Sequence, residues 1–218
     1  MRTIGRLASG LAVVALLPAA LSAQSGQSSF KDAWFWGAKV GNMTFWTTQV
    51  QRGQAPLVGG EWLITRNHGA LYLSLDGEFF KDNSSVPDAA NGGERVVQMK
   101  DMRRLTVAGF MFPKAFGALR PYGGVGMAVN IIQTVATQGQ YVSAAQFDEV
   151  QTELEDQKNR ASPILIVGAQ LQMSRLSVFG QGSYMPAQAG FLLNNNETYF
   201  LEAGIRFNVG SSIEKIDN

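Results

Sequence analysis

The chain has 218 residues, 45% of them hydrophobic, with 24 glycines, no cysteine and a formal net charge of +1. Without cysteine, disulfides and thiolate metal sites are excluded. The near-neutral charge leaves no basic excess to hold a phosphate backbone, so we do not expect nucleic acid as a partner.

The start of the chain has the pattern of a secretory signal peptide. Two arginines are followed by the apolar stretch Leu11–Leu21 and then by small residues that include Ala23. The apolar stretch is shorter than the roughly 20 residues of a transmembrane helix. We therefore expect residues 1–23 to direct export through the Sec pathway, with cleavage near Ala23. Residues 24–218 then form one domain, whose formal charge is −1 because both arginines are lost.

Alternation of apolar and polar residues predicts eight strands, most of them close to the roughly 9–11 residues that cross a bilayer at a tilt. The clearest example places Leu71, Leu73 and Leu75 on one face, opposite Tyr72, Ser74 and Asp76. The predicted strands are Trp34–Trp46, Pro56–Thr65, Ala70–Phe80, Arg104–Phe112, Tyr122–Ile131, Ile164–Met173, Leu176–Met185 and Thr198–Val209.

The connections between these strands alternate in length. The short ones are 66–69, 113–121 and 174–175, and the long ones are 47–55, 81–103, 132–163 and 186–197. Bacterial membrane barrels have short periplasmic turns and longer extracellular loops. The pattern predicts an all-β fold, an eight-stranded antiparallel up-and-down transmembrane β-barrel with both termini in the periplasm.

The third long connection carries a predicted helix, Ser143 to Lys158. A capping box starts at Ser143, and Phe147, Val150 and Leu154 follow at helical spacing. We place this helix in the third extracellular loop. Its other face is acidic, and it is either a solvated surface or a site for a cation or a partner. The acidic residues are Asp148, Glu149, Glu153, Glu155 and Asp156.

Charged residues share the inward face of the predicted strands. An arginine facing lipid near the midplane costs roughly 2–4 kcal/mol, whereas inward charges can pair with one another. We expect Lys39, Glu202 and Arg206 to form one cluster, because the first and last strands are neighbours in a closed barrel. Glycines on the inward face leave room for large side chains, which predicts a filled lumen. The expected lumen charge cluster is Lys39, Glu61, Asp76, Glu78, Arg104, Glu202 and Arg206.

Aromatic residues near the strand ends match the interfacial girdles of membrane barrels. Their alternative interpretation is the core of a soluble β-sandwich. These residues are Trp34, Trp36, Trp46, Trp62, Tyr122, Tyr184 and Tyr199.

At the last strand, the sequence resembles the small bacterial outer-membrane β-barrel family of OmpA, OmpX and OmpW type, over about residues 34–209. Glu202, Gly204, Phe207 and Val209 are similar to the family's assembly signal. The resemblance implies insertion by the barrel-assembly machinery and an outer-membrane location. Many members end at this strand, whereas this chain continues to residue 218.

Nothing in the sequence predicts a catalytic, cofactor or metal site, and we expect no enzyme. The only histidine, His68, lies in a predicted turn whose Asn and Gly suit turn geometry. The glycines of Gly123–Gly126 lie inside a strand with no helix following, unlike a phosphate-binding loop. Asp76 and Glu78 could in principle serve acid–base chemistry, but salt bridging in the lumen is the simpler interpretation.

Three functions remain open. The first is a structural or surface-interaction barrel, expected to be a monomer in the membrane, whose partners are outer-membrane lipid and lipopolysaccharide. The second is a narrow channel or a conduit for small hydrophobic molecules. The third is a soluble exported lipocalin-like or β-sandwich binding protein. A need for detergent separates the third from the first two, and single-channel conductance separates those two from each other.

Overall fold

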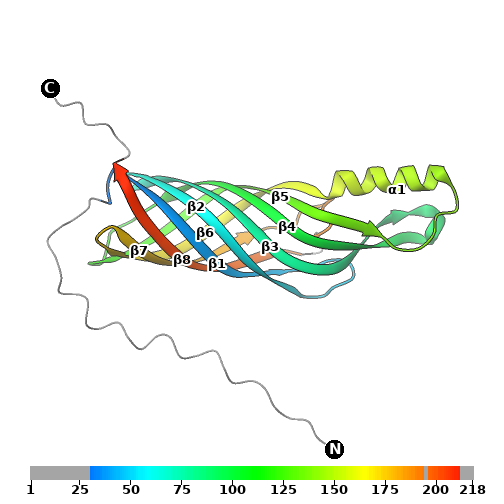
Figure 1. Ribbon diagram of the computed structural model, residues 1–218, viewed down its shortest axis with the longest axis horizontal. Helices are drawn as coiled ribbons and strands as arrows, with labels where there is room; N and C mark the ends of the chain where they lie inside the picture. The colour runs from blue at the N-terminus through cyan, green and yellow to red at the C-terminus, as the bar shows by residue number, and fades with distance from the viewer. Residues whose placement is uncertain (1–29, 194–195, 212–218) are drawn as a thin grey trace, which may run out of the picture.

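The computed structural model describes residues 30–193 and 196–211, which form a closed antiparallel barrel of eight strands in which β1 pairs with both β2 and β8 (Figure 1). The predicted fold class is confirmed. The signal peptide and its cleavage near Ala23 lie outside the described residues. The strands are β1 (Ala33–Phe45), β2 (Gly53–Arg66), β3 (Gly69–Asp88), β4 (Gly93–Met111), β5 (Leu119–Thr137), β6 (Asn159–Met173), β7 (Leu176–Met185) and β8 (Thr198–Ser211).

Around the middle of the barrel, the outer wall is apolar and the interior is polar. Outward residues such as Val125 and Leu201 are 64% and 72% exposed, whereas inward residues such as Ser74 and Arg206 are fully buried. A sandwich or a lipocalin has the opposite arrangement, with its apolar side chains inside. The apolar outer residues form a belt around all eight strands, as a lipid-facing surface requires.

Two of the expected long loops are shorter than predicted, because the strands beside them continue. β3 and β4 stay paired as far as Asp88 and Gly93, on either side of the short 3-10 helix η1 (Ala89–Asn91), so most of 81–103 is strand. β5 likewise runs to Thr137. Beyond the belt the exposed residues of these strands are mostly polar, so the alternation that marks the strands is lost there while the hydrogen-bonded ladder continues. Figure 1 shows β3, β4 and β5 projecting past their neighbours at one end of the barrel.

Helix α1 (Ala144–Gln157) lies between β5 and β6, beside the projecting strands (Figure 1). The Ser143 hydroxyl accepts a hydrogen bond from Gln146 N at 3.2 Å, which caps the helix as its sequence predicts. Val150 and Leu154 are buried, but Phe147 is 44% exposed and lies against the ring of Tyr141. No helix in the described part of the chain is long and apolar enough to cross a membrane.

The interior is closed at the short-turn end by packed aromatic rings. Phe30 and Phe112 lie 4.7 Å apart between ring centroids, and Phe110 stacks on Tyr122 at 5.1 Å. The inward glycine Gly124 makes this packing possible, because a Cβ there would overlap the ring of Phe110. The expectation that inward glycines make room for large side chains is therefore confirmed at this position.

The opposite end of the interior is closed by methionine, phenylalanine and leucine side chains. Met43, Phe45 and Met102 are fully buried there, near the long connections. The segment Phe191–Leu193 folds over them and is also buried. It is held by hydrogen bonds from Ser84 Oγ to Leu192 O at 2.8 Å and from Leu192 N to Gln157 O at 3.2 Å. The barrel is therefore filled in three layers, an aromatic layer at the short-turn end, a charged layer in the middle and a mixed apolar layer at the long-loop end.

Candidate functional site

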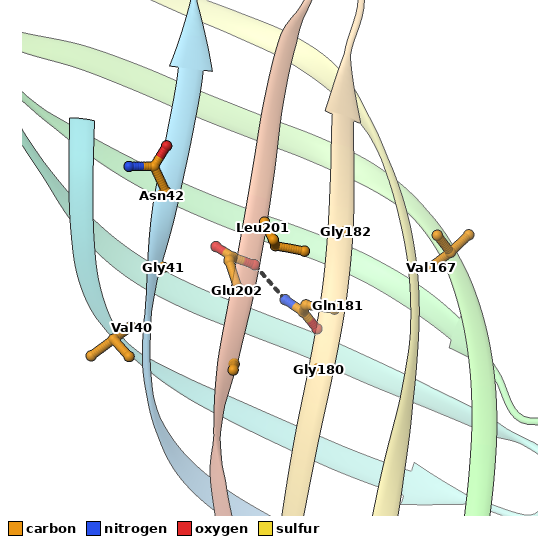
Figure 2. Close-up of a pocket in the computed structure, with 10 residues that line it drawn as sticks. Val40, Gly41, Asn42, Val167, Gly180, Gln181, Gly182, Leu201 and Glu202 are labelled. Atoms are coloured by element: carbon orange, nitrogen blue, oxygen red, sulfur yellow. Dashed lines mark hydrogen bonds between the residues drawn. The ribbon is translucent and has the colours of Figure 1, made fainter. Parts of the chain in front are cut away.

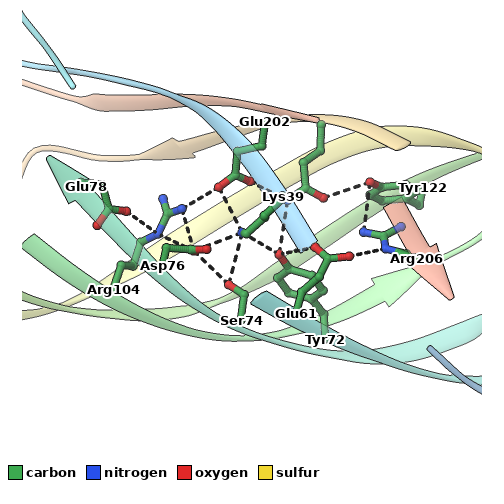
Figure 3. Close-up of polar contacts among 11 residues, drawn as sticks. Lys39, Glu61, Tyr72, Ser74, Asp76, Glu78, Arg104, Tyr122, Glu202 and Arg206 are labelled. Atoms are coloured by element: carbon green, nitrogen blue, oxygen red, sulfur yellow. Dashed lines mark hydrogen bonds and ion pairs between the residues drawn. The ribbon is translucent and has the colours of Figure 1, made fainter. Parts of the chain in front are cut away.

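A polar network, most of which is drawn in Figure 3, fills the middle layer. It receives at least one side chain from every strand. All seven charged residues of the expected lumen cluster lie in it, and each is at most 3% exposed. Its members are Lys39 from β1, Glu61 from β2, Tyr72, Ser74, Asp76 and Glu78 from β3, Arg104 from β4, Tyr122 from β5, Gln170 from β6, Gln181 from β7, and Glu202 and Arg206 from β8.

One half of the network is centred on Glu202. Its Oε1 lies 2.6 Å from Arg104 Nη2 and 3.1 Å from Lys39 Nζ. Asp76 Oδ2 lies 2.9 Å and 3.1 Å from the same two nitrogens. Two cations and two carboxylates thus alternate around a compact square, in which each charge has two opposite neighbours. Such pairing offsets part of the cost of removing the charges from water.

The other half of the network is centred on Arg206, whose ion-pair partner is Glu61. Arg206 Nε is paired with Glu61 Oε1, not with Glu202 on its own strand. Its Nη1 donates to Gln170 Oε1 at 2.6 Å. Residues four apart on a strand lie about 13 Å apart along it, whereas Glu61 comes level with Arg206 across β1. Of the three residues expected in one cluster, Lys39 and Glu202 are paired directly, whereas Arg206 is linked to Glu202 only indirectly, for example through the neutral side chains of Tyr122 and Gln181.

Neutral side chains join the two halves. Tyr72 Oη accepts from Lys39 Nζ at 2.9 Å and donates to Glu61 Oε2 at 3.1 Å. Gln181 Nε2 donates to Glu202 Oε2 at 2.6 Å, and its Oε1 accepts from Tyr122 Oη at 2.9 Å. The charged residues are consequently parts of one continuous network, connected through amides and phenols.

Tyr122 is a network residue that sequence reasoning placed wrongly. We expect it in the outer aromatic girdle, but it is 4% exposed and points inward. The signal was present, because Tyr122 shares its strand parity with the inward residues Gly124 and Gly126. A Cβ at Gly168 would lie 2.7 Å from Tyr122 Oη, so a glycine on β6 gives the phenol its place.

Charge in the network is not balanced. Three cations, Lys39, Arg104 and Arg206, face four carboxylates. The surplus carboxylate is Glu78, which is 3.4 Å from Arg104 Nε but makes no hydrogen bond within the described residues. Asp76 Oδ1 and Arg104 Nη1 also lack hydrogen-bond partners there. The least satisfied part of the network therefore lies around Glu78, against the mixed apolar layer.

The other residues singled out in the sequence lie apart from this network. His68 is in the turn between β2 and β3, where its carbonyl accepts from Phe112 N at 2.7 Å. Gly123–Gly126 is part of β5. Phe207 and Val209 point outward from β8, 49% and 52% exposed. Within the described ranges, no three His, Cys, Asp or Glu side chains are grouped so as to hold a metal ion.

Figure 2 shows a hollow in the outer wall, where β7 carries Gly180 and Gly182 among larger neighbours. Val40, Val167 and Leu201 stand around it and are each more than 60% exposed. Gln181 and Glu202 lie behind it, joined by the hydrogen bond drawn in Figure 2. The hollow is almost wholly apolar and belongs to the lipid-facing belt.

Solved structures with the same architecture are outer-membrane barrels. The Neisserial surface protein NspA aligns over 80% of this chain and 96% of its own, with a TM-score of 0.53 and 7% sequence identity. This chain has the fold of a small outer-membrane β-barrel. The N-terminal barrel domain of Pseudomonas aeruginosa OprF aligns over 82% of this chain and 98% of its own, with a TM-score of 0.48 and 13% identity. OprG of the same organism aligns over 82% and 94%, with a TM-score of 0.42 and 12% identity.

No protein-family model matches the sequence. No curated protein matches it either. At these identities the structural likeness extends to the fold alone, and function must be argued from the chain's own residues.

Proposed function

We propose that the protein is a structural and surface-interaction barrel of the bacterial outer membrane, inserted by the barrel-assembly machinery as a monomer with its long-loop end outside the cell. The observation that carries this proposal is the three-layer filling of the interior. Aromatic rings close one end, the ion-pair network joins the strands in the middle, and Phe191–Leu193 folds over the other end. A filled lumen supports a scaffold rather than a path for solutes.

The projecting end of the barrel provides a surface for interactions beyond the apolar belt. β3 has 20 residues, roughly twice the 9–11 that cross a bilayer, and its outward apolar residues end at Phe79. Beyond them a buried ion pair joins Asp88 and Arg95 at 2.6 Å, and Gln146 of α1 donates to Asp88 at 2.9 Å. These contacts hold the β3–β4 hairpin and α1 together in one continuous surface, which suits contact with a partner or with the lipopolysaccharide layer.

Conductance tests the filled lumen. In planar lipid bilayers, we expect the purified barrel to give no steady channel currents, because the three packed layers block the passage of ions through the lumen. The alternative function, a narrow channel or conduit, requires an open path through those layers. Reproducible ohmic steps from the monomeric barrel would favour that alternative and contradict the proposal.

Surface labelling tests the orientation, and the chain suits it because it has no cysteine of its own. Asn91→Cys places a thiol at the tip of the β3–β4 hairpin, and Lys114→Cys places one in the turn between β4 and β5. With a membrane-impermeant maleimide on intact cells, we expect labelling at Asn91→Cys only. Labelling at Lys114→Cys alone would invert the orientation.

A further inference from the structure

Three basic side chains stand together on the outer wall, at the long-loop edge of the apolar belt. Lys81 of β3 is the register partner of Lys100 on β4, and Arg103 follows on β4 towards the short turns. All three are exposed. We refer to Lys81, Lys100 and Arg103 as the basic ladder. On β5, Lys100 has Thr134 as its register partner, whose exposed hydroxyl continues the row.

The basic ladder is short of negative charge. Like charges directly opposite one another on an antiparallel pair repel and destabilise it. Within the part of the chain that the structure describes, neither Lys81 nor Arg103 forms an ion pair with a carboxylate. Lys100 Nζ lies 4.0 Å from Asp101 Oδ2, and the other oxygen of Asp101 already accepts from Phe80 N at 3.2 Å. An anion from outside the chain would relieve the repulsion.

Arg103 is seated on the wall rather than extended into solvent. Its guanidinium lies 5.6 Å from the centroid of the Phe79 ring. It covers Gly77, where a Cβ would collide with Arg103 Nη1. Glycine at this outward position therefore allows the guanidinium to lie flat at the edge of the belt. A guanidinium with a fixed orientation is suited to the oxygens of a phosphate group.

An apolar strip runs from the basic ladder towards the middle of the belt. Phe79, Leu75 and Leu105 form it, and they are 42%, 53% and 48% exposed. The wall thus offers positive charge and apolar surface in the order in which a lipid of the outer leaflet carries its phosphate and its acyl chains. A free phosphate ion would use the charges and leave the strip uncovered.

We infer that the basic ladder binds the headgroup phosphate of a phosphorylated outer-leaflet lipid, whose acyl chains lie along the strip of Phe79, Leu75 and Leu105. The inference rests on the proposed function in one respect, which is that the long-loop end of the belt meets the outer leaflet. Binding itself is a property of the wall, so it can be measured on the purified barrel in detergent. Its failure is then separate from a failure of the labelling experiment on cells.

The test is calorimetric titration of the folded barrel, in zwitterionic detergent, with lipopolysaccharide that retains its phosphates. The variant Lys81→Gln/Lys100→Gln/Arg103→Gln should bind at least about tenfold more weakly than wild type, because each basic residue near an anionic lipid contributes favourably. The matched control is Arg66→Gln/Lys114→Gln/Arg175→Gln, which removes three exposed charges from the short-turn end and should bind as wild type does.

Two further arms fix the chemistry. Lys81→Arg/Lys100→Arg keeps the charge and should retain binding, which separates loss of charge from loss of fold. Lipopolysaccharide stripped of its phosphates should bind the wild type as weakly as the triple Gln variant binds the intact lipid. Equal binding of intact and stripped lipid would overturn the inference, and so would unchanged binding by the triple Gln variant. Displacement by inorganic phosphate at an equal phosphate concentration would assign the ladder to a free anion and overturn the lipid assignment.

Discussion

Gly37 stands between Glu61 and Arg206, and the two charged side chains meet across it. Gly37 is the register partner of Glu61 on β2 and of Arg206 on β8. An ideal Cβ at Gly37 would lie 2.9 Å from Glu61 Oε1 and 2.8 Å from the Ile205 carbonyl. The missing side chain on β1 therefore allows an ion pair between strands that are not themselves neighbours.

Gly37→Val should destabilise the folded barrel, because the new side chain occupies the space in which Glu61 meets Arg206. Overpacking of this kind costs roughly 1–3 kcal/mol, to which a weakened ion pair would add. The matched control is Gly109→Val, since a Cβ at that strand glycine meets nothing within 4 Å. Urea unfolding in detergent measures both. Equal free energies of unfolding for the two variants would contradict the role assigned to Gly37.

Arg206→Leu should destabilise the barrel far more than Arg52→Leu. Removing one member of a buried ion pair costs about 3–5 kcal/mol, whereas an exposed pair is worth at most about 1 kcal/mol, and Arg52 is exposed. Urea unfolding of the two variants in the same detergent gives the comparison. Similar losses would place Arg206 in contact with water.

The partner of Arg206 can be identified by double-mutant cycles. Adding Glu61→Leu to Arg206→Leu should recover part of the lost free energy of unfolding, because no charge of that pair then stays buried alone. Adding Glu202→Leu should lower the free energy of unfolding further, because it removes the carboxylate that Lys39 and Arg104 share. If Glu202→Leu relieves the defect and Glu61→Leu does not, the pairing described here is wrong.

Glu78→Gln should leave the stability of the barrel within about 1 kcal/mol of wild type, or increase it, because buried charges without full partners are costly. It removes the surplus negative charge from a side chain that makes no hydrogen bond within the described residues. Glu202→Gln is the comparison, because it breaks two short ion pairs and should cost several times more. A greater loss for Glu78→Gln would show that the charge on Glu78 stabilises the network.

The docking of α1 should depend on pH through Asp88, which lies beyond the apolar belt. Hydrogen bonds from Gln146 and then from Arg95, together with the charge of Arg95, hold the pKa of Asp88 below its ordinary value. A lowered carboxylate pKa stabilises the docked state fully at pH values above the ordinary pKa of about 3.9. This contribution is lost as the pH falls through the lowered pKa. Asp88→Asn should therefore weaken docking at pH 7 and make little difference once the pH lies below the lowered pKa of Asp88.

Fluorescence anisotropy of a dye on Asp156→Cys, at the exposed face of α1, reports this docking without disturbing the buried face. The dye should become freer in Asp88→Asn at pH 7, and in the wild type only as the solution is acidified. If the dye has the same anisotropy in Asp88→Asn as in the wild type at pH 7, the charge of Asp88 does not hold α1 in place.

Sequence reasoning succeeded where the decisive property is local. Leu71 and Leu75 face outward and Ser74 and Asp76 face inward because successive strand residues point to opposite sides, whatever the rest of the barrel does. The same parity takes all seven expected lumen charges into the interior. The start of α1 was also local, since Ser143 caps a helix through a residue three positions away.

Tertiary structure alone decided which charges meet. Arg206 pairs with Glu61 rather than with Glu202 because partners depend on the register of β8, β1 and β2, which closure of the whole barrel fixes. The end of β3 and the start of β4 could not be predicted for a related reason. Past Phe79 the outer face is mostly polar, so the alternation is lost, while pairing between the two strands continues to Asp88 and Gly93. The inward or outward direction of each side chain depends on its own strand, whereas register and strand length depend on segments far apart in the sequence.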